Sequence, residues 1–100
     1  MHAVIRNYTG AANLADQLKP HQKDIEREIG GVPGFIAYYL VETGEGIATI
    51  TLCEQPAGCE ESSRRAANWL RQNLPNLKIA PPQIITGELA FKLATQKAGL

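Results

Sequence analysis

Runs of apolar residues separated by turn-forming residues predict six elements, in the order strand, helix, strand, strand, helix, strand. The first strand is expected over residues 2–8, HAVIRNY, which are rich in β-branched and aromatic side chains. Residues 34–42 and 46–54 are expected to form the second and third strands, and the sequence TGEG between them predicts a hairpin turn. The fourth strand is expected in QIITGELAFK, residues 83–92. The remaining LATQKAGL is expected to form a short helix or a frayed tail.

The two helices are predicted from apolar positions that share one helical face. The first carries leucine and isoleucine at spacings of four and seven within residues 14–29, and a Gly-Gly pair then ends it. Pro20 interrupts this helix, and a proline there removes a hydrogen bond and clashes with the preceding turn at a cost of about 3 kcal/mol. A kink is therefore expected near Lys19. The second helix is expected in AGCEESSRRAANWLRQNL, which ends before Pro75.

This order of elements predicts the ferredoxin-like α+β fold, in which four antiparallel strands are covered on one face by two helices. The chain has 100 residues, of which 44% are hydrophobic, and both values are ordinary for a globular protein with one core. Residues 1–100 are therefore expected to form a single domain.

The second strand is apolar on both of its faces. Neighbouring strand residues point to opposite faces, so one set is Phe35, Ala37, Tyr39 and Val41, and the other is Ile36, Tyr38 and Leu40. Two helices cover one face only, and the other would expose a large apolar patch. Because two-fold dimers are the commonest closed assemblies, a homodimer is expected, with the helix-free faces of two sheets packed together.

Charge and cysteine content narrow the possible partners. Ten acidic and ten basic residues are interspersed and give a net charge of zero, which argues against a nucleic-acid partner. The N-terminal sequence lacks the features of a signal peptide, and no apolar run approaches the roughly 20 residues that span a bilayer. A cytoplasmic location without a membrane partner is therefore expected. Cys53 and Cys59 lack zinc-site spacing, so we expect reduced, structural thiols and no metal site.

Several segments together carry a resemblance to a known superfamily. They are the strand ending in RNY, the helix closing on VPGF, the hairpin FIAYYLVETGEGIATITLCE and the helix AGCEESSRRAANWLRQNL. Over Ala3 to about Phe91 the chain resembles the dimeric α+β barrel superfamily, and most closely small proteins of the antibiotic biosynthesis monooxygenase type. That family includes cofactor-independent oxygenases of polyketide quinones, haem-degrading enzymes and proteins without a known activity. The resemblance therefore implies a fold and a homodimer, and leaves the reaction open.

Two residues resemble pocket residues of the haem-degrading members in type and place. They are Asn7, near the end of the first strand, and Trp69, in the second helix. The histidine that follows the tryptophan in that set is missing, and neither His2 nor His21 matches its place. Without this axial ligand, haem binding is not expected, and no other cofactor is implied. The structural alternatives are a hydrogen-bonding role for Asn7 at the strand end and a core or dimer-contact role for Trp69.

A small-molecule site is expected between the sheet and the helices, with Asn7, Tyr39 and Trp69 as its ligand-binding residues. Ala66 and Ala67 beside Trp69 are small enough to leave space there. Few polar groups and many apolar ones favour a planar aromatic or quinone-like ligand. The alternative is that these alanines only let the helix approach the sheet closely. No catalytic residue is assigned, because no constellation of a base and a nucleophile is present.

Arg6 is expected on the same strand face as Val4 and Tyr8. An arginine buried there without a partner would be costly, so a carboxylate is expected beside it, either Glu88 or Glu54. A bound anionic ligand is the alternative.

Two classes of function follow from these observations. The first is a cofactor-independent oxygenase acting on a small aromatic or quinone-like substrate, which itself becomes an electron-rich anion. The second is a non-catalytic dimeric ligand-binding or structural protein of the same fold. The sequence leaves open whether the protein is an enzyme.

Overall fold

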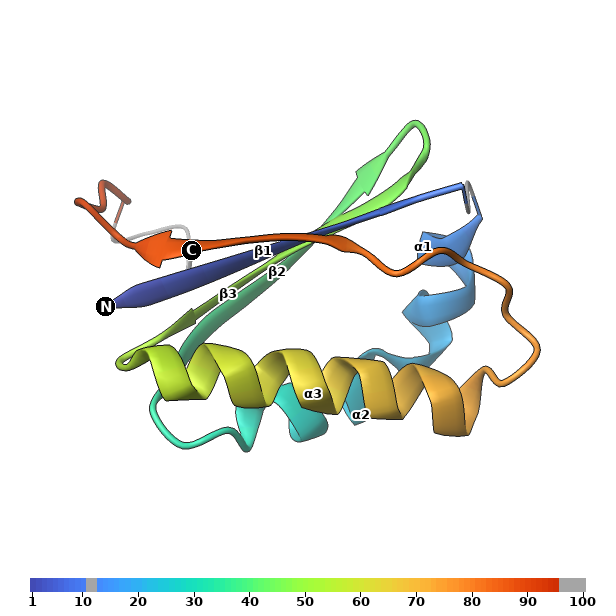
Figure 1. Ribbon diagram of the computed structural model, residues 1–100, viewed down its shortest axis with the longest axis horizontal. Helices are drawn as coiled ribbons and strands as arrows, with labels where there is room; N and C mark the ends of the chain where they lie inside the picture. The colour runs from blue at the N-terminus through green and yellow to red at the C-terminus, as the bar shows by residue number, and fades with distance from the viewer. Residues whose placement is uncertain (11–12, 96–100) are drawn as a thin grey trace.

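The chain folds into a four-stranded antiparallel sheet with helices on one of its faces, as Figure 1 shows for the computed structural model. The structure describes residues 1–10 and 13–95. Its elements are β1 (His2–Thr9), α1 (Leu14–Leu18), the 3-10 turn η1 (Lys19–His21), α2 (Gln22–Gly30), β2 (Phe35–Thr43), β3 (Gly46–Cys53), α3 (Pro56–Asn73) and β4 (Gln83–Glu88). The strands lie in the order β2-β3-β1-β4, which confirms the predicted ferredoxin-like α+β fold.

The predicted break in the first helical segment is confirmed. Pro20 lies in η1, which joins α1 to α2. A proline lacks the backbone N–H that a continuous α-helix needs at this point, so the chain tightens into one 3-10 turn and then restarts. Within the described residues, no helix combines the length and the apolar character needed to cross a bilayer.

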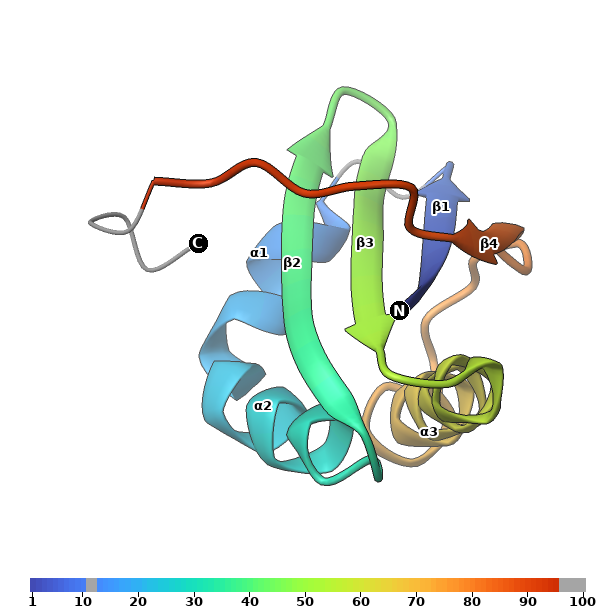
Figure 2. The same cartoon turned by 90° about the vertical axis from the view of Figure 1, so that its left-hand side faces the viewer.

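The fourth strand is shorter than predicted, because β4 ends at Glu88 rather than near residue 92. Its partner β1 begins at His2, and the bond from Leu89 N to Met1 O is the last one along this edge. Residues 89–95 have no partner strand and cross toward β2, as Figure 2 shows. Residues 93–95 are not helical, and the rest of the predicted tail lies outside the described residues.

Strand register defines the face of the sheet that the helices leave uncovered. Residues directly opposite each other in paired strands share a face, and Tyr39 pairs with Ile50, Ile50 with Ile5, and Ile5 with Ile85. This apolar row runs across all four strands. Ile5 is 37% exposed and Ile85 is 66% exposed, so the row is open in the single chain.

A β-bulge at the start of β2 puts Phe35 on a different face of the sheet from the one predicted. Between Phe35 and Ala37 the register with β3 shifts by one residue, so Phe35 no longer shares a face with Tyr39. Phe35 instead packs on a buried cluster that contains Val4 and Val32 on the helix side. The bulge therefore adds a large aromatic ring to the covered face.

Two buried clusters form the core between the sheet and the helices. One joins β1, β3, α1 and α3 through Tyr8, Leu14, Ala15, Leu18, Ile47 and Trp69. The other, at the opposite end of α3, contains Val4, Val32, Cys53 and Cys59. Both thiols are free and buried, and burial raises their pKa values. This placement fits the predicted structural role of the two cysteines.

Candidate functional site

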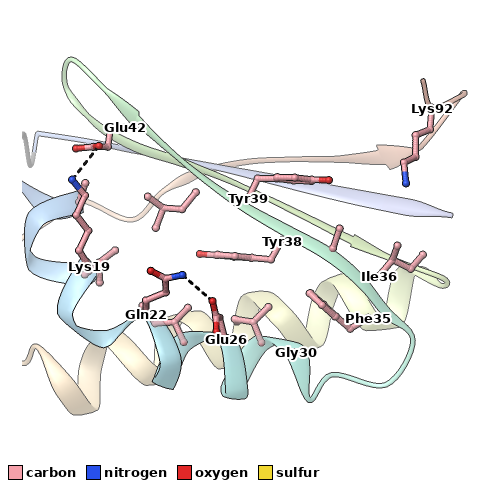
Figure 3. A pocket seen from close by; sticks show the side chains of 16 residues that line it. Lys19, Gln22, Glu26, Gly30, Phe35, Ile36, Tyr38, Tyr39, Glu42 and Lys92 are labelled. Carbon is pink, nitrogen blue, oxygen red and sulfur yellow. Dashed lines mark hydrogen bonds and ion pairs between the residues drawn. The ribbon is translucent and has the colours of Figure 1, made fainter. Parts of the chain in front are cut away.

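A cavity that opens to solvent lies between the edge strand β2 and the segment from α1 to α2 (Figure 3). Its volume is about 690 Å³. Apolar side chains from both sides form its inner wall: Ala15, Leu18, Ile25, Ile29, Phe35 and Leu40. Charged and amide groups form its rim, where Lys19 Nζ lies 3.2 Å from Glu42 Oε2 and Gln22 Nε2 donates a 2.9 Å hydrogen bond to Glu26 Oε1. The site is therefore apolar inside and polar at its mouth.

Three aromatic side chains of β2 line this cavity, Phe35, Tyr38 and Tyr39, and Figure 3 shows Tyr38 extending into the space between β2 and α2. Tyr38 also lines a separate inner recess of about 40 Å³, whose walls include Thr49 of β3 and Trp69 of α3. Burial raises the pKa of Tyr38 to about 12, although the positive charge of Arg6 acts in the opposite direction. Its hydroxyl is therefore protonated at neutral pH and available as a hydrogen-bond donor.

Trp69 lies at the inner recess, 7% exposed. Its Nε1 donates a 2.7 Å hydrogen bond to Asp24 Oδ2 on α2. The His21 ring meets the indole edge to face, with ring centroids 5.2 Å apart. The indole thus forms part of the recess wall and also joins α3 to α2.

Arg6 is buried at the centre of the sheet–helix interface. The prediction that a carboxylate lies beside it is wrong. Its guanidinium donates hydrogen bonds to four hydroxyls: Thr49 and Thr51 at 3.2 Å, Ser63 at 3.1 Å and Ser62 at 2.5 Å. Glu88 instead pairs with the N-terminal amine, at 3.8 Å. The sequence shows these four hydroxyls, but their convergence depends on how α3 packs against β3.

The three residues predicted to bind a ligand do not lie on one face of the sheet. Register places Asn7 opposite Ala48 and Gln83, and Tyr39 opposite Ile50, on the helix-free face. Trp69 lies on the other side of the sheet. Figure 3 likewise shows the Tyr38 and Tyr39 rings on opposite sides of β2. Tyr39 still lines the outer edge of the cavity and Trp69 lines the recess, whereas Asn7 is among the lining residues of neither space. That these residues bind a ligand stays a prediction.

Tyr38 and Arg6 lie on the helix-covered face of the sheet, where Tyr39 and Asn7 were expected. Strict alternation in β1 already separates Asn7 from Arg6 and Tyr8, and alternation in β2 separates Tyr39 from Tyr38. Which of the two faces the helices cover is decided by packing. The hydroxyl-rich helix side of β3, with Thr49 and Thr51, is the sequence signal that matches a buried arginine.

The residues that line the cavity and recess do not fit haem. No histidine is among the described lining residues of either space. His21 packs on Trp69 outside them, and His2 lies at the start of β1. The described residues also contain no cluster of three metal-ligating side chains.

Comparisons with known proteins concern the fold. No protein-family model matches the sequence, and a search of curated proteins finds no significant match. Among solved structures, the haem degrader MhuD from Mycobacterium tuberculosis, with two haems in its active site, is similar with a TM-score of 0.69 and 13% identity over 94% of this chain and 100% of that chain. The monooxygenase ActVA-Orf6 of Streptomyces coelicolor, in complex with nanaomycin D, gives a TM-score of 0.63 and 19% identity over 94% and 90%.

A third similar structure is SnoaB from Streptomyces nogalater, a cofactor-independent oxygenase. It has a TM-score of 0.63 and 9% identity over 94% of this chain and 97% of that chain. Sequence identities this low show a shared fold but not a shared activity. The chain therefore has the ferredoxin-like fold of the antibiotic biosynthesis monooxygenase-like dimeric α+β barrel proteins, as its resemblance to them implied.

Proposed function

We propose that this protein binds a small planar aromatic or quinone-like molecule between β2 and α2 and oxygenates it without a bound cofactor. The observation that carries the proposal is the cavity of about 690 Å³, with apolar walls around the Tyr38 phenol. Such a volume suits a small organic ligand, and the apolar inner wall favours a flat ring system over a sugar or a phosphate. The nanaomycin D complex of one similar structure and the cofactor-independent chemistry of another support it.

Oxygenation without a cofactor requires a substrate that supplies its own electrons. A flat ketone such as anthrone loses a proton from its CH₂ group, and the resulting enolate reacts with O₂. The net change converts CH₂ to C=O and releases one water molecule. The protein then has to hold the substrate, exclude water and stabilise the anion. Tyr38 is suited to donate a hydrogen bond to the enolate oxygen, because it stays protonated.

Non-catalytic binding is the second candidate function, and the state of the rim carboxylates favours it. Glu42 pairs with Lys19 at 3.2 Å, and the exposed Glu26 accepts a hydrogen bond from Gln22. A solvated or paired carboxylate is a weak base, so it removes a proton from carbon slowly. Under this candidate the ligand is bound and released unchanged.

The test is to titrate 1,4-naphthoquinone into the protein by calorimetry and to measure oxygen uptake with anthrone. Leu40→Trp should fill the cavity and abolish binding, whereas Glu45→Trp in the exposed hairpin is the matched control. Binding together with enzyme-dependent formation of anthraquinone supports the oxygenase. Binding without turnover supports the second candidate. Unchanged binding in a folded Leu40→Trp variant would contradict a ligand site in this cavity.

We also propose that the functional unit is a homodimer formed through the helix-free faces of two sheets. The apolar row of Tyr39, Ile50, Ile5 and Ile85 supports this assembly, since a monomer would leave it in water. A two-fold interface is self-complementary, and a continuous apolar row on each copy can satisfy it.

We infer that the protein works in a reducing compartment such as the cytoplasm. The Cys53 and Cys59 thiols support this inference, because both are buried and unpaired. Thiols persist in that form where the surroundings are reducing.

A further inference from the structure

Arg6 is a buried cation whose charge no described carboxylate neutralises. Its side chain is 1% exposed, and its hydrogen bonds go to the neutral hydroxyls of Thr49, Thr51, Ser62 and Ser63. No ion pair within residues 1–10 and 13–95 includes it. Hydroxyls satisfy the N–H donors but bring no negative charge, so the surroundings of the guanidinium hold a positive potential.

The charge of Arg6 lies directly behind the inner recess. Thr49 accepts a hydrogen bond from Arg6 Nη1 at 3.2 Å and also lines the recess. The titratable groups that surround Arg6, one from each packed element, are Tyr8 of β1, Tyr38 of β2, Cys53 of β3 and Cys59 of α3. All four are neutral acids at pH 7, so none offsets the charge.

Tyr38 connects this charged region to the ligand cavity. Its side chain lines both the recess and the outer cavity, and Leu18, Ile25 and Ile29 are shared by the two spaces in the same way. An aromatic ring that contacts the Tyr38 hydroxyl would therefore lie within the positive potential of Arg6. Figure 3 shows the ring of Tyr38 extending from β2 over the rim residues Gln22 and Glu26.

We propose that Arg6 makes this site selective for acidic aromatic ligands bound as anions, with the Tyr38 hydroxyl donating a hydrogen bond to the charged oxygen. The inference rests on the proposed function, since it assumes that the ligand occupies the cavity between β2 and α2. A buried positive charge stabilises a nearby anion, and apolar surroundings strengthen the attraction. Arg6 acts through Thr49 and Tyr38, so it is a positioning residue. In an oxygenase it would stabilise the enolate that reacts with O₂.

The experiment compares two probes of nearly equal shape and different charge. 2-Hydroxy-1,4-naphthoquinone is an anion at neutral pH, and 2-methoxy-1,4-naphthoquinone carries the same rings without charge. Each is titrated into the full chain by calorimetry at pH 7. The wild-type protein should bind the anion about tenfold more tightly or better, as expected for a charge in a poorly solvated site. In acid, affinity for the hydroxyquinone should fall as the probe protonates, while affinity for the ether stays constant.

Three variants assign the preference to particular residues. Arg6→Met removes the charge and keeps a long side chain, and it should bind the two probes equally. Tyr38→Phe keeps the ring, loses the donor and should show a reduced preference. Arg64→Met is the control, because Arg64 is an exposed arginine of the same helix that holds Ser62 and Ser63, and the preference should persist. Circular dichroism and thermal unfolding verify that each variant folds.

The outcomes separate the two proposals. If neither probe binds to the wild-type protein, the proposed function is contradicted. Equal wild-type affinity for the two probes overturns the selectivity and leaves the proposed function standing. A preference retained in folded Arg6→Met would assign it to the rim cations Lys19 and Lys92 and overturn the role of Arg6. If Arg6→Met does not fold, the wild-type ratio and Tyr38→Phe decide, since an unreduced preference in Tyr38→Phe contradicts the hydrogen bond.

Discussion

Trp69 Nε1 donates a 2.7 Å hydrogen bond to Asp24 Oδ2, and this contact joins the C-terminal part of α3 to the first turn of α2. The indole is 7% exposed, so its N–H has little access to water if the carboxylate is removed. Asp24→Ala should therefore lower the free energy of unfolding by about 1 to 2 kcal/mol, the cost of an unsatisfied buried donor. Urea denaturation, followed by the fluorescence of this single tryptophan, measures the change.

Two matched variants distinguish the hydrogen bond from a general charge effect. Asp24→Asn keeps an acceptor for the indole and should recover most of the loss. Asp16→Ala removes an exposed carboxylate that pairs with Lys19 on the surface, and it should change stability little. A loss in Asp16→Ala as large as in Asp24→Ala would contradict the assignment to the Trp69 bond.

The raised pKa of Tyr38 predicts that the folded protein loses stability in alkali. This pKa is raised from 10.0 to about 12 by burial, so the folded chain keeps this proton at pH values where the unfolded chain has lost it. The contribution is fully present below pH 10 and is lost as pH rises toward 12. Two pKa units correspond to at most about 3 kcal/mol. Burial raises the pKa of Tyr8 as well, so its effect has the same sign.

Denaturation at pH values between 8 and 12 tests this sign. Tyr38→Phe should flatten the fall in stability, and absorbance titration of the phenols should lose its latest step. Tyr39→Phe removes a hydroxyl from the opposite face of the same strand and is the matched control. A fall in stability that is equally steep in Tyr38→Phe would show that other groups cause it.

Gly58 lies in the first turn of α3, against Cys53 of β3. A methyl group at this position would lie 2.9 Å from Cys53 Cβ and 3.1 Å from Pro33 O. Alanine is favoured over glycine inside a helix by about 1 kcal/mol, but crowding a packed core costs about 1 to 3 kcal/mol. Gly58→Ala should therefore destabilise the protein in thermal unfolding. Gly30→Ala is the control, because nothing lies within 4 Å of its added methyl group, and it should leave stability unchanged or higher.

The order of elements follows from the sequence because apolar spacing and turn residues act locally. The Pro20 break, the hairpin and the shared face of Val4, Arg6 and Tyr8 depend only on neighbours along the chain. The positions of Asn7 and Tyr39 on the helix-free face depend on more than neighbours along the chain. Alternation states which residues share a face, whereas the packing of α2 and α3 decides which face is covered.

The surroundings of Arg6 depend on contacts between residues far apart in sequence. Ser62 is 56 positions from Arg6 and Thr49 is 43 positions away, so no local pattern joins them. A carboxylate was the expected partner because it offsets a buried charge, but four hydroxyls complete the hydrogen bonds instead. The cavity likewise lies between β2 and the segment from α1 to α2, and helical spacing alone does not reveal such a gap.

The proposed dimer is tested by two adjacent isoleucines of β4. Ile85 lies on the helix-free face opposite Ile5, and Ile84 lies on the other face opposite Arg6. Both are exposed in the single chain, at 66% and 52%. Ile85→Glu would place a charge in an apolar two-fold interface, and the symmetry brings the same charge of the second subunit into that interface. The dimer should therefore dissociate. Ile84→Glu carries the same substitution in the same strand and should remain dimeric. Light scattering at micromolar concentration reports the masses, and a wild-type protein of monomer mass, or equal masses for both variants, would contradict assembly through this face.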